Sequence, residues 1–258
     1  MFCVILAGGL GTRISSETVT KPKPMIKIFS KPILLRIIDL YMSYGVNKFI
    51  ISTGYKHKYI VNYFRKSKNN NIFLDSAGKK KFNNKVLNRF NLSKKKKKIF
   101  VKICNTGLKS ETGGRIFYLK ELLRKEEMFF ATYGDGLSNV NIRELFQSHQ
   151  THAPIVTVTA VKQPSRFGQI ILERVSAYVK DFNEKPIDDS WINGGFMVIS
   201  KNIFKYLKKD ENLEKVTLKK IVKLKNKLYA FRHKGFWQCV DTLRDKKIIE
   251  KLLKKEND

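Results

Sequence analysis

A short apolar run that ends in a glycine-rich loop opens the chain and constrains its fold more than any other feature. Residues 2–6 are all apolar, and Gly8, Gly9 and Gly11 follow almost at once. A strand that is apolar at every position is buried on both faces, as in a parallel sheet covered by helices. Ligands bind in open α/β sheets at the carboxyl ends of such strands. The opening residues therefore predict an α/β fold with a binding site beside the first strand.

Helical and strand patterns alternate along the rest of the chain. Residues 33–44 carry apolar side chains at helical spacing and stop at Gly45, and residues 49–53 form a β-type run, so a right-handed βαβ unit is expected. Further strands are expected at 99–103, 128–132, 155–161, 169–172, 178–182, 196–199 and 228–232, and helices at 115–125, 142–149, 201–207, 214–224 and 242–254. This order predicts a mainly parallel sheet flanked by helices, in a single domain over residues 1–258.

Residues 65–98 differ from the rest, because Asn, Lys, Ser and Gly dilute their apolar positions. They are expected to form a variable insertion, with short elements only near 72–74 and 86–90. The run from Lys94 to Lys98 lies in this insertion and is interpreted as a solvated loop, with a specific anion site as the alternative.

The formal net charge of +30 raises the question of a nucleic-acid or membrane partner. Lysine is spread over the whole length, however, so we expect neither partner. No stretch approaches the roughly 20 consecutive apolar residues of a membrane helix, which favours a cytoplasmic protein. Cys3, Cys104 and Cys239 are far apart and sit among apolar neighbours, so buried free thiols are expected in place of a disulfide or a zinc site.

The loop after the first strand reads L-A-G-G-L-G-T-R, and K-P-K-P-M follows it. Glycines allow backbone N–H groups to approach phosphate oxygens, and Arg13 offers a rigid donor fork. The prolines beside Lys23 stiffen its loop. The loop is therefore interpreted as a polyphosphate site, and the simpler alternative is a tight connection with a surface arginine.

Two carboxylates are candidate metal ligands. Asp135 stands in T-Y-G-D-G at the end of an apolar strand, on the same sheet edge as the glycine loop, and Asp241 stands where a strand gives way to the last helix. Two carboxylates together with substrate phosphates are how proteins hold Mg²⁺. For Asp241 the alternative is an N-cap of that helix.

Four further segments carry polar groups between glycines: E-T-G-G-R, R-F-G, F-N-E-K-P and W-I-N-G-G-F. Lys185 offers a charge to a sugar phosphate, Glu184 an acceptor for hydroxyls, and Asn193 a donor and an acceptor. Together with the G-G-x-G-T-R and P-K-P signature, these segments resemble the sugar nucleotidylyltransferases. Their order is similar to that of the glucose-1-phosphate cytidylyltransferase branch, and the resemblance covers about residues 2–250.

The resemblance implies a Rossmann-like fold of the nucleotide-diphospho-sugar transferase type and a homo-oligomer that uses CTP, glucose 1-phosphate and Mg²⁺. It implies Arg13 and Lys23 as catalytic residues, and Asp135 and Asp241 as Mg²⁺ ligands. The nucleotide site it implies consists of Leu6, Ala7, Gly8, Gly9, Gly11, Thr12, Arg13, Lys23, Ser110, Arg115 and Gly134. The sugar-phosphate site it implies consists of Gly168, Glu184, Lys185 and Asn193.

The attacking phosphate of the sugar is already anionic at neutral pH, so we expect catalysis by positioning and charge neutralisation, without a protein nucleophile. Two alternatives stay open at this point. One is a sibling enzyme that uses UTP, dTTP or GTP or another sugar phosphate, and the other is a basic nucleic-acid-binding protein.

Overall fold

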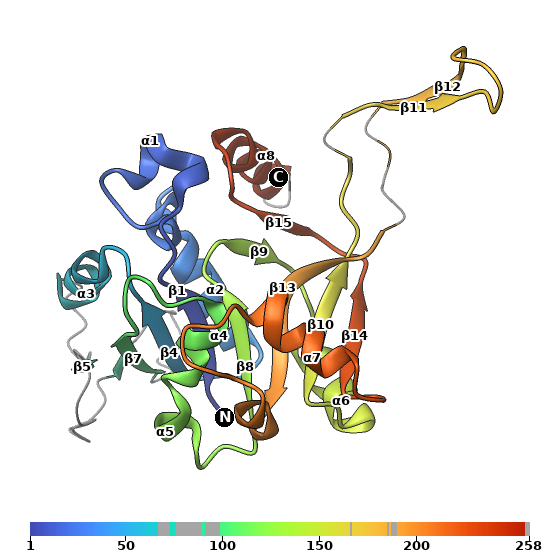
Figure 1. Cartoon of the computed structure of the whole chain (residues 1–258). Coiled ribbons are helices and arrows are strands. Elements are labelled where there is room, and N and C mark those ends of the chain that lie inside the picture. The colour runs from blue at the N-terminus through green and yellow to red at the C-terminus, as the bar shows by residue number, and fades with distance from the viewer. Residues whose placement is uncertain are drawn as a thin grey trace.

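The computed structural model describes residues 1–66, 73–75, 89–90, 99–165, 167–184, 186 and 190–255. In this part of the chain a nine-stranded sheet has the order β14-β10-β13-β8-β1-β4-β7-β5, with β6 paired to β7 (Figure 1). Its strands are β1 (Cys3–Ala7), β4 (Lys48–Thr53), β5 (Phe73–Asp75), β6 (Arg89–Phe90), β7 (Ile99–Asn105), β8 (Met128–Tyr133), β10 (Val156–Val161), β13 (Ile192–Ser200) and β14 (Leu228–His233). β1 runs parallel to β4 and β8, β7 to β4 and β5, and β10 to β14, whereas β13 runs antiparallel to β8 and β10, and β6 to β7. Most pairings among the described strands are parallel, which confirms the predicted mainly parallel sheet.

The first strand is buried on both faces, as its composition predicts. Cys3 and Ile5 belong to one hydrophobic cluster, and Val4 and Leu6 belong to the other. The chain then passes through α2 (Ile33–Ser43) and returns as β4 parallel to β1, which confirms the βαβ unit.

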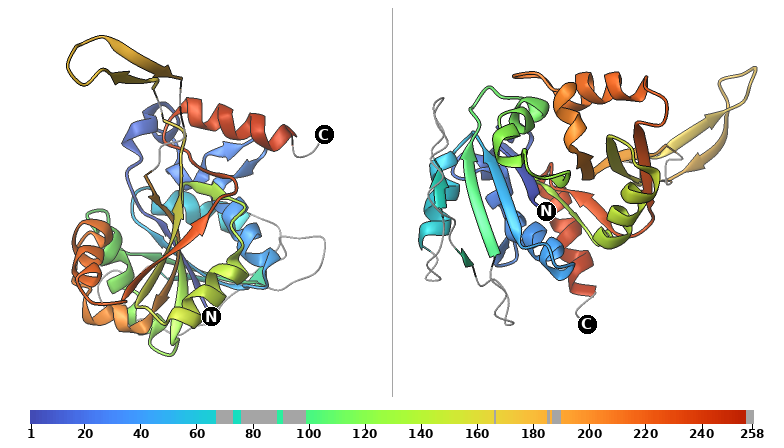
Figure 2. Two further views of the ribbon diagram at one scale, coloured as in Figure 1. Left: turned by 90° about the vertical axis from the view of Figure 1, so that its right-hand side faces the viewer. Right: turned by 90° about the horizontal axis from the view of Figure 1, so that it is seen from below.

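Helices cover the sheet on two sides (Figure 2). One side carries α2, α3 (His57–Lys66) and α6 (Ile142–His152), and the other carries α4 (Thr112–Phe117), α5 (Lys120–Leu123), the 3₁₀ turn η3 (Lys201–Lys205), the π-helical turn η4 (Leu213–Leu218) and α7 (Lys219–Val222). The last helix, α8 (Leu243–Lys255), packs on the short strands β15 (Trp237–Cys239) and β2 (Lys27–Ile28). None of the helices in the described ranges combines the length and the apolar character that crossing a bilayer requires.

Several predicted helices differ from those observed. The single helix expected at 115–125 is two short ones, because the Leu119 N–H bonds to the Ile116 carbonyl and tightens the chain between them. The helix expected at 201–207 is 3₁₀ over η3, and the one expected at 214–224 begins as the π-helical η4. We did not predict α3, although its buried residues Ile60 and Phe64 have helical spacing.

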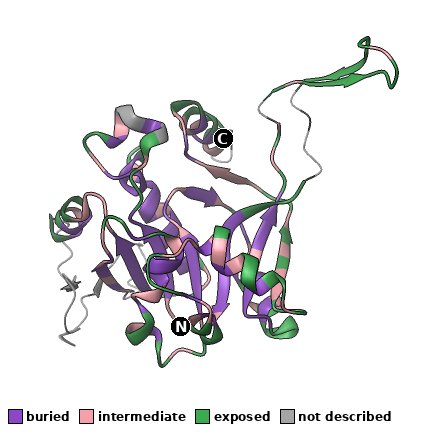
Figure 3. Ribbon diagram, viewed as in Figure 1, coloured by how far each residue is buried: buried purple, intermediate pink, exposed green. Residues whose placement is uncertain are grey.

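A two-stranded arm, β11 (Gln169–Leu172) and β12 (Val179–Asn183), projects from the body of the molecule (Figure 1). Both strands were predicted, and every residue in them is exposed (Figure 3). Of the expected insertion at 65–98, the structure describes the end of α3 together with β5 and β6, and Lys94 to Lys98 lie outside the described residues.

Candidate active site

A cavity of about 1020 Å³ opens at the carboxyl ends of β1 and β8. Its walls come from the glycine loop after β1, the segment 108–115, the turn after β8, the start of β13 and the segment 237–241. Because β13 is antiparallel to β8, its first residues lie at the edge where β8 ends. Asn193 therefore lines the cavity together with residues that follow the parallel strands. The short strands β9 (Gly136–Ser138) and β15 (Trp237–Cys239) pair and bring residue 241 beside residue 135.

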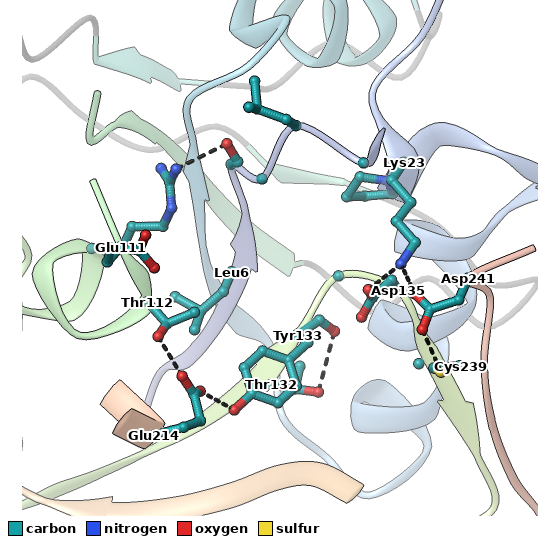
Figure 4. A pocket seen from close by; sticks show the side chains of 18 of the residues that line it. Leu6, Lys23, Glu111, Thr112, Thr132, Tyr133, Asp135, Glu214, Cys239 and Asp241 are labelled. Carbon is teal, nitrogen blue, oxygen red and sulfur yellow. Dashed lines mark hydrogen bonds and ion pairs between the residues drawn. The ribbon is translucent and has the colours of Figure 1, made fainter. Parts of the chain in front are cut away.

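Lys23, Asp135 and Asp241 meet on one side of the cavity (Figure 4). The Lys23 ammonium lies 2.6 Å from Asp135 Oδ2 and 2.6 Å from Asp241 Oδ1. Lys23 begins the 3₁₀ turn η2 (Lys23–Met25), in which Pro24 and Met25 are buried. Burial by itself lowers the pKa of Lys23, but the carboxylates of Asp135 and Asp241 raise it above its ordinary value. Lys23 is therefore a charged ammonium that draws the two carboxylates to one point.

The last helix does not use Asp241 as its N-cap. Thr242 Oγ1 accepts a hydrogen bond from the Asp245 N–H (3.2 Å), and Asp245 Oδ2 accepts one from the Thr242 N–H (2.7 Å). This reciprocal pair is a capping box in which Thr242 is the cap. The capping interpretation of Asp241 is therefore wrong, and its carboxylate faces Lys23.

Cys239 lies beside these carboxylates and is half-buried, whereas Cys3 and Cys104 are buried as expected. Its thiol donates to Asp241 Oδ2 at 3.6 Å. Burial, reinforced by the negative charge of Asp241, raises the pKa of Cys239 to about 12. The thiol is thus protonated at neutral pH and is a poor nucleophile.

Arg115 fixes the glycine loop from the opposite side. Its guanidinium donates to the carbonyls of Gly8 (2.9 Å), Thr53 (3.1 Å) and Gly107 (3.1 Å). A Cβ on Gly8 would stand 2.0 Å from Arg115 Nη1, so only glycine lets the guanidinium approach the loop this closely. Arg115 thus joins the loop after β1 to the loop after β7.

A second polar group lies on the far side of Tyr133 from Lys23 (Figure 4). Glu214 accepts from the Tyr133 hydroxyl and from Thr112 Oγ1 (2.7 Å), and Asn193 Nδ2 donates to the Tyr133 hydroxyl (3.2 Å). Of these four residues, only Asn193 was predicted. Glu214 stands in a lysine-rich helical pattern, so its spacing looks like that of a surface residue.

The structure gathers most of the predicted site residues around this one cavity. Those that line it are Leu6, Gly8, Gly9, Gly11, Thr12, Lys23, Ser110, Arg115, Gly134, Asp135, Asn193 and Asp241. Ala7 is buried at the end of β1, while Gly168 and Glu184 lie at the base of the arm and do not line the cavity. The side chain of Arg13 and the whole of Lys185 lie outside the part of the chain that the structure describes.

Known proteins resemble this chain over nearly its full length. A family model described as nucleotidyl transferase matches residues 2–251. The glucose-1-phosphate cytidylyltransferase of Salmonella typhi is 38% identical over 99% of this chain and 96% of its own, and the probable glucose-1-phosphate cytidylyltransferase of Bacillus subtilis is 38% identical over 98% and 96%. Among solved structures, HddC from Yersinia pseudotuberculosis has a TM-score of 0.67 at 25% identity, covering 98% of this chain and 99% of that one.

Proposed function

This chain belongs to the nucleotidyl transferase family, and we propose that it transfers the cytidylyl group of CTP to α-D-glucose 1-phosphate, releasing pyrophosphate. The family is enzymatic, so the predicted enzyme class is confirmed. The observation that carries the choice of substrates is the 38% identity to the Salmonella typhi glucose-1-phosphate cytidylyltransferase over almost the whole chain.

In this reaction a phosphate oxygen of glucose 1-phosphate forms a bond to the α-phosphorus of CTP. The bond from that phosphorus to the bridging oxygen breaks, and the electron pair leaves with pyrophosphate. The attacking oxygen is already anionic, so no side chain has to remove a proton. We infer that Lys23 and Arg13 neutralise the phosphates and that the backbone of the glycine loop positions them. Arg115 supports that loop through the Gly8 carbonyl.

The donor set of this site fits Mg²⁺. Asp135 and Asp241 place one oxygen each 2.6 Å from a single ammonium, so both carboxylates already converge on a cation. Within the described residues no three His, Cys, Asp or Glu side chains gather to hold a metal alone, which suits an ion whose other ligands are phosphates and water. We infer that Asp135 and Asp241 would hold Mg²⁺, which when bound would neutralise triphosphate charge. Lys23 would then contact phosphate.

We infer that Asn193, with Gly168, Glu184 and Lys185, binds the sugar phosphate. Asn193 lines the cavity, and a Cβ on Gly168 would come 3.0 Å from Glu184 Oε2, so two of these residues are neighbours. The apolar side chains that the arm of β11 and β12 exposes support the inference of a homo-oligomer. Ile170 and Phe182 are 58% exposed in one chain, more apolar surface than an isolated arm normally leaves in water.

A cytoplasmic location, a single domain over residues 1–258, and the absence of nucleic-acid and membrane partners stay predictions. Strands from both ends of the chain join one sheet, which supports the single domain.

Purified protein incubated with glucose 1-phosphate, Mg²⁺ and each of ATP, CTP, GTP, UTP and dTTP tests the proposal through pyrophosphate release. We expect CTP to exceed every other triphosphate by roughly tenfold or more, a difference that hydrogen-bonded base recognition readily supplies. Equal or better turnover with UTP would overturn the choice of CTP and leave the enzyme class standing.

A further inference from the structure

Glu214 is a carboxylate in the cavity for which the proposed reaction has no assigned use. It comes from η4, whose start is capped by Asn212, since the Asn212 side chain accepts from the Lys215 N–H at 2.8 Å. Isolated π-helical turns often occur at functional sites. Glu214 lines the same cavity as Lys23, Asp135 and Asp241 but lies beyond Tyr133 from them (Figure 4).

Two other elements, β8 and α4, hold the carboxylate in place. The Tyr133 hydroxyl donates to Oε1, and Thr112 Oγ1 donates to Oε2 at 2.7 Å. Thr112 is itself held, because its Oγ1 accepts from the Leu213 N–H at 2.9 Å. Both oxygens of Glu214 therefore point in fixed directions, and each keeps a lone pair that can accept another donor.

The ring of Tyr133 is equally constrained. Gly195 has φ +80°, and a Cβ there would stand 2.3 Å from Tyr133 Cδ2, so the ring packs directly on the backbone of β13. The ring is thus held where its hydroxyl donates to Glu214.

The negative charge of Glu214 determines which chemical groups of a substrate this part of the cavity can bind. Phosphates are repelled by a carboxylate and attracted by Lys23 at the other side. The two partners of Glu214 are hydroxyls, and a charged acceptor forms stronger hydrogen bonds with hydroxyl donors than a neutral acceptor does. The surroundings of Glu214 therefore suit a neutral polyhydroxyl group.

We propose that Glu214 binds a sugar hydroxyl of the substrate, with Tyr133 and Thr112 as the positioning residues that aim its carboxylate. This inference rests on the proposed function. The hydroxyl belongs either to the ribose of the nucleotide or to the hexose, since both present the same chemistry. Asn193, which donates to Tyr133, connects this site to the predicted sugar-phosphate residues.

Pairing a protein variant with substrates that lack one hydroxyl tests the proposal. In Glu214→Gln the amide still accepts from Tyr133 and can donate to Thr112, so the network persists without the charge. We measure kcat and KM for wild type and variant with CTP, 2′-deoxy-CTP and 3′-deoxy-CTP, and with glucose 1-phosphate and its 2-, 3-, 4- and 6-deoxy forms. Glu127→Gln is the matched control, because Glu127 is exposed and pairs with Lys201 at 2.6 Å.

We expect wild type to discriminate against one deoxy substrate by about tenfold or more, as for a hydrogen bond to a charged group. Glu214→Gln should lose most of that discrimination while raising KM for the parent substrate, and Glu127→Gln should match wild type. A ribose analogue identifies the nucleotide as the source of the hydroxyl, and a hexose analogue identifies the sugar phosphate. Unchanged discrimination for every analogue in Glu214→Gln would overturn the proposal and leave Glu214 a purely structural residue.

Two further measurements keep the result interpretable. If Glu214→Gln does not fold, Tyr133→Phe and Thr112→Val replace it, since each removes one donor that aims the carboxylate and should lower the same discrimination. If wild type prefers another nucleotide or sugar phosphate, the proposed function fails by itself, and the deoxy series is repeated on the preferred pair. A wild type that neither turns over nor binds any of these pairs would overturn both proposals.

Discussion

Lys23 contacts Asp135 and Asp241 at once, and this contact determines what each substitution can be expected to do. Removing one carboxylate leaves Lys23 paired with the other, so the fold should tolerate the loss. Thr242 and Asp245 cap α8 without help from Asp241, so its replacement should leave the start of that helix intact.

We therefore expect Asp135→Asn and Asp241→Asn each to lower kcat on the order of 10²-fold, because each deletes charge aimed at the reacting phosphates. Melting temperatures should stay close to that of wild type. Two residues that act on one cation behave as a unit, so the double variant should lose much less than the product of the single losses. Fully multiplicative losses in steady-state kinetics would show that the two carboxylates have separate roles.

The contact between α6 and β10 depends on an uncharged histidine. His149 is 2% exposed, its Nδ1 lies 2.8 Å from Thr157 Oγ1, and burial lowers its pKa from 6.5 to about 4. In the unfolded chain His149 has its ordinary pKa of 6.5, so it takes up a proton more readily there than in the folded chain. The contribution of neutral His149 to the free energy of unfolding is therefore fully present above pH 6.5 and is lost as the pH falls toward 4.

By pH 5, His149 should have cost about 2 kcal/mol of unfolding free energy relative to pH 7, since one pKa unit corresponds to about 1.4 kcal/mol. His149→Gln keeps a neutral hydrogen-bonding side chain and should lack this component. Urea unfolding of both proteins at pH 7 and pH 5 measures the difference. Identical pH dependence in the two proteins would contradict a neutral, buried His149.

The arm of β11 and β12 exposes apolar side chains through which two copies of the chain could contact each other. Ile170 pairs directly with Phe182, so both side chains share one face of the arm. Residues 167–184 carry three acidic and two basic side chains, a net charge of −1 against +30 for the chain, which suits contact with the basic body of another copy. Replacing Ile170 and Phe182 with Ser should therefore lower the oligomeric mass.

Light scattering after size-exclusion chromatography measures that mass. The control is Val222→Ser on α7, which removes an apolar side chain that is 61% exposed. The melting temperature of the isolated chain should not change, because neither arm residue belongs to a hydrophobic cluster of the body. An unchanged mass in the arm variant would exclude the arm as the contact between copies.

For the whole molecule, the net charge of +30 is a surface property that we expect to be separable from activity. If Lys94 to Lys98 form the solvated loop that the sequence predicts, replacing them with Ser should leave kcat within about twofold. Steady-state kinetics measures this, and melting temperature verifies the fold. Loss of activity in a folded variant would assign the run a function, and tight, salt-sensitive binding of duplex DNA by wild type would restore the nucleic-acid interpretation.

Local patterns were enough to determine the layout of the chain. The apolar run of β1, the spacing of α2 and the glycines after β1 each involve neighbours in sequence, so period and composition reveal them. The placement of Asp135 at the binding edge follows for the same reason, because it directly succeeds a buried strand. Even the exposed strands of the arm were predicted, from their own composition and turns.

Only the tertiary structure decided which of these residues meet. Lys23 reaches across 112 positions to Asp135 and 218 to Asp241, and Glu214 reaches across 81 to Tyr133. The hydrogen bond from Arg115 to the Gly8 carbonyl and the contact of Asp241 with Lys23 likewise join distant segments. The break between α4 and α5 depends on a backbone hydrogen bond within one turn. Such contacts leave no period in the sequence, because their partners are chosen by packing of the finished sheet and its loops. Composition and spacing therefore predicted a glycine loop at the binding edge of the sheet, but packing determined which other residues line the cavity with it.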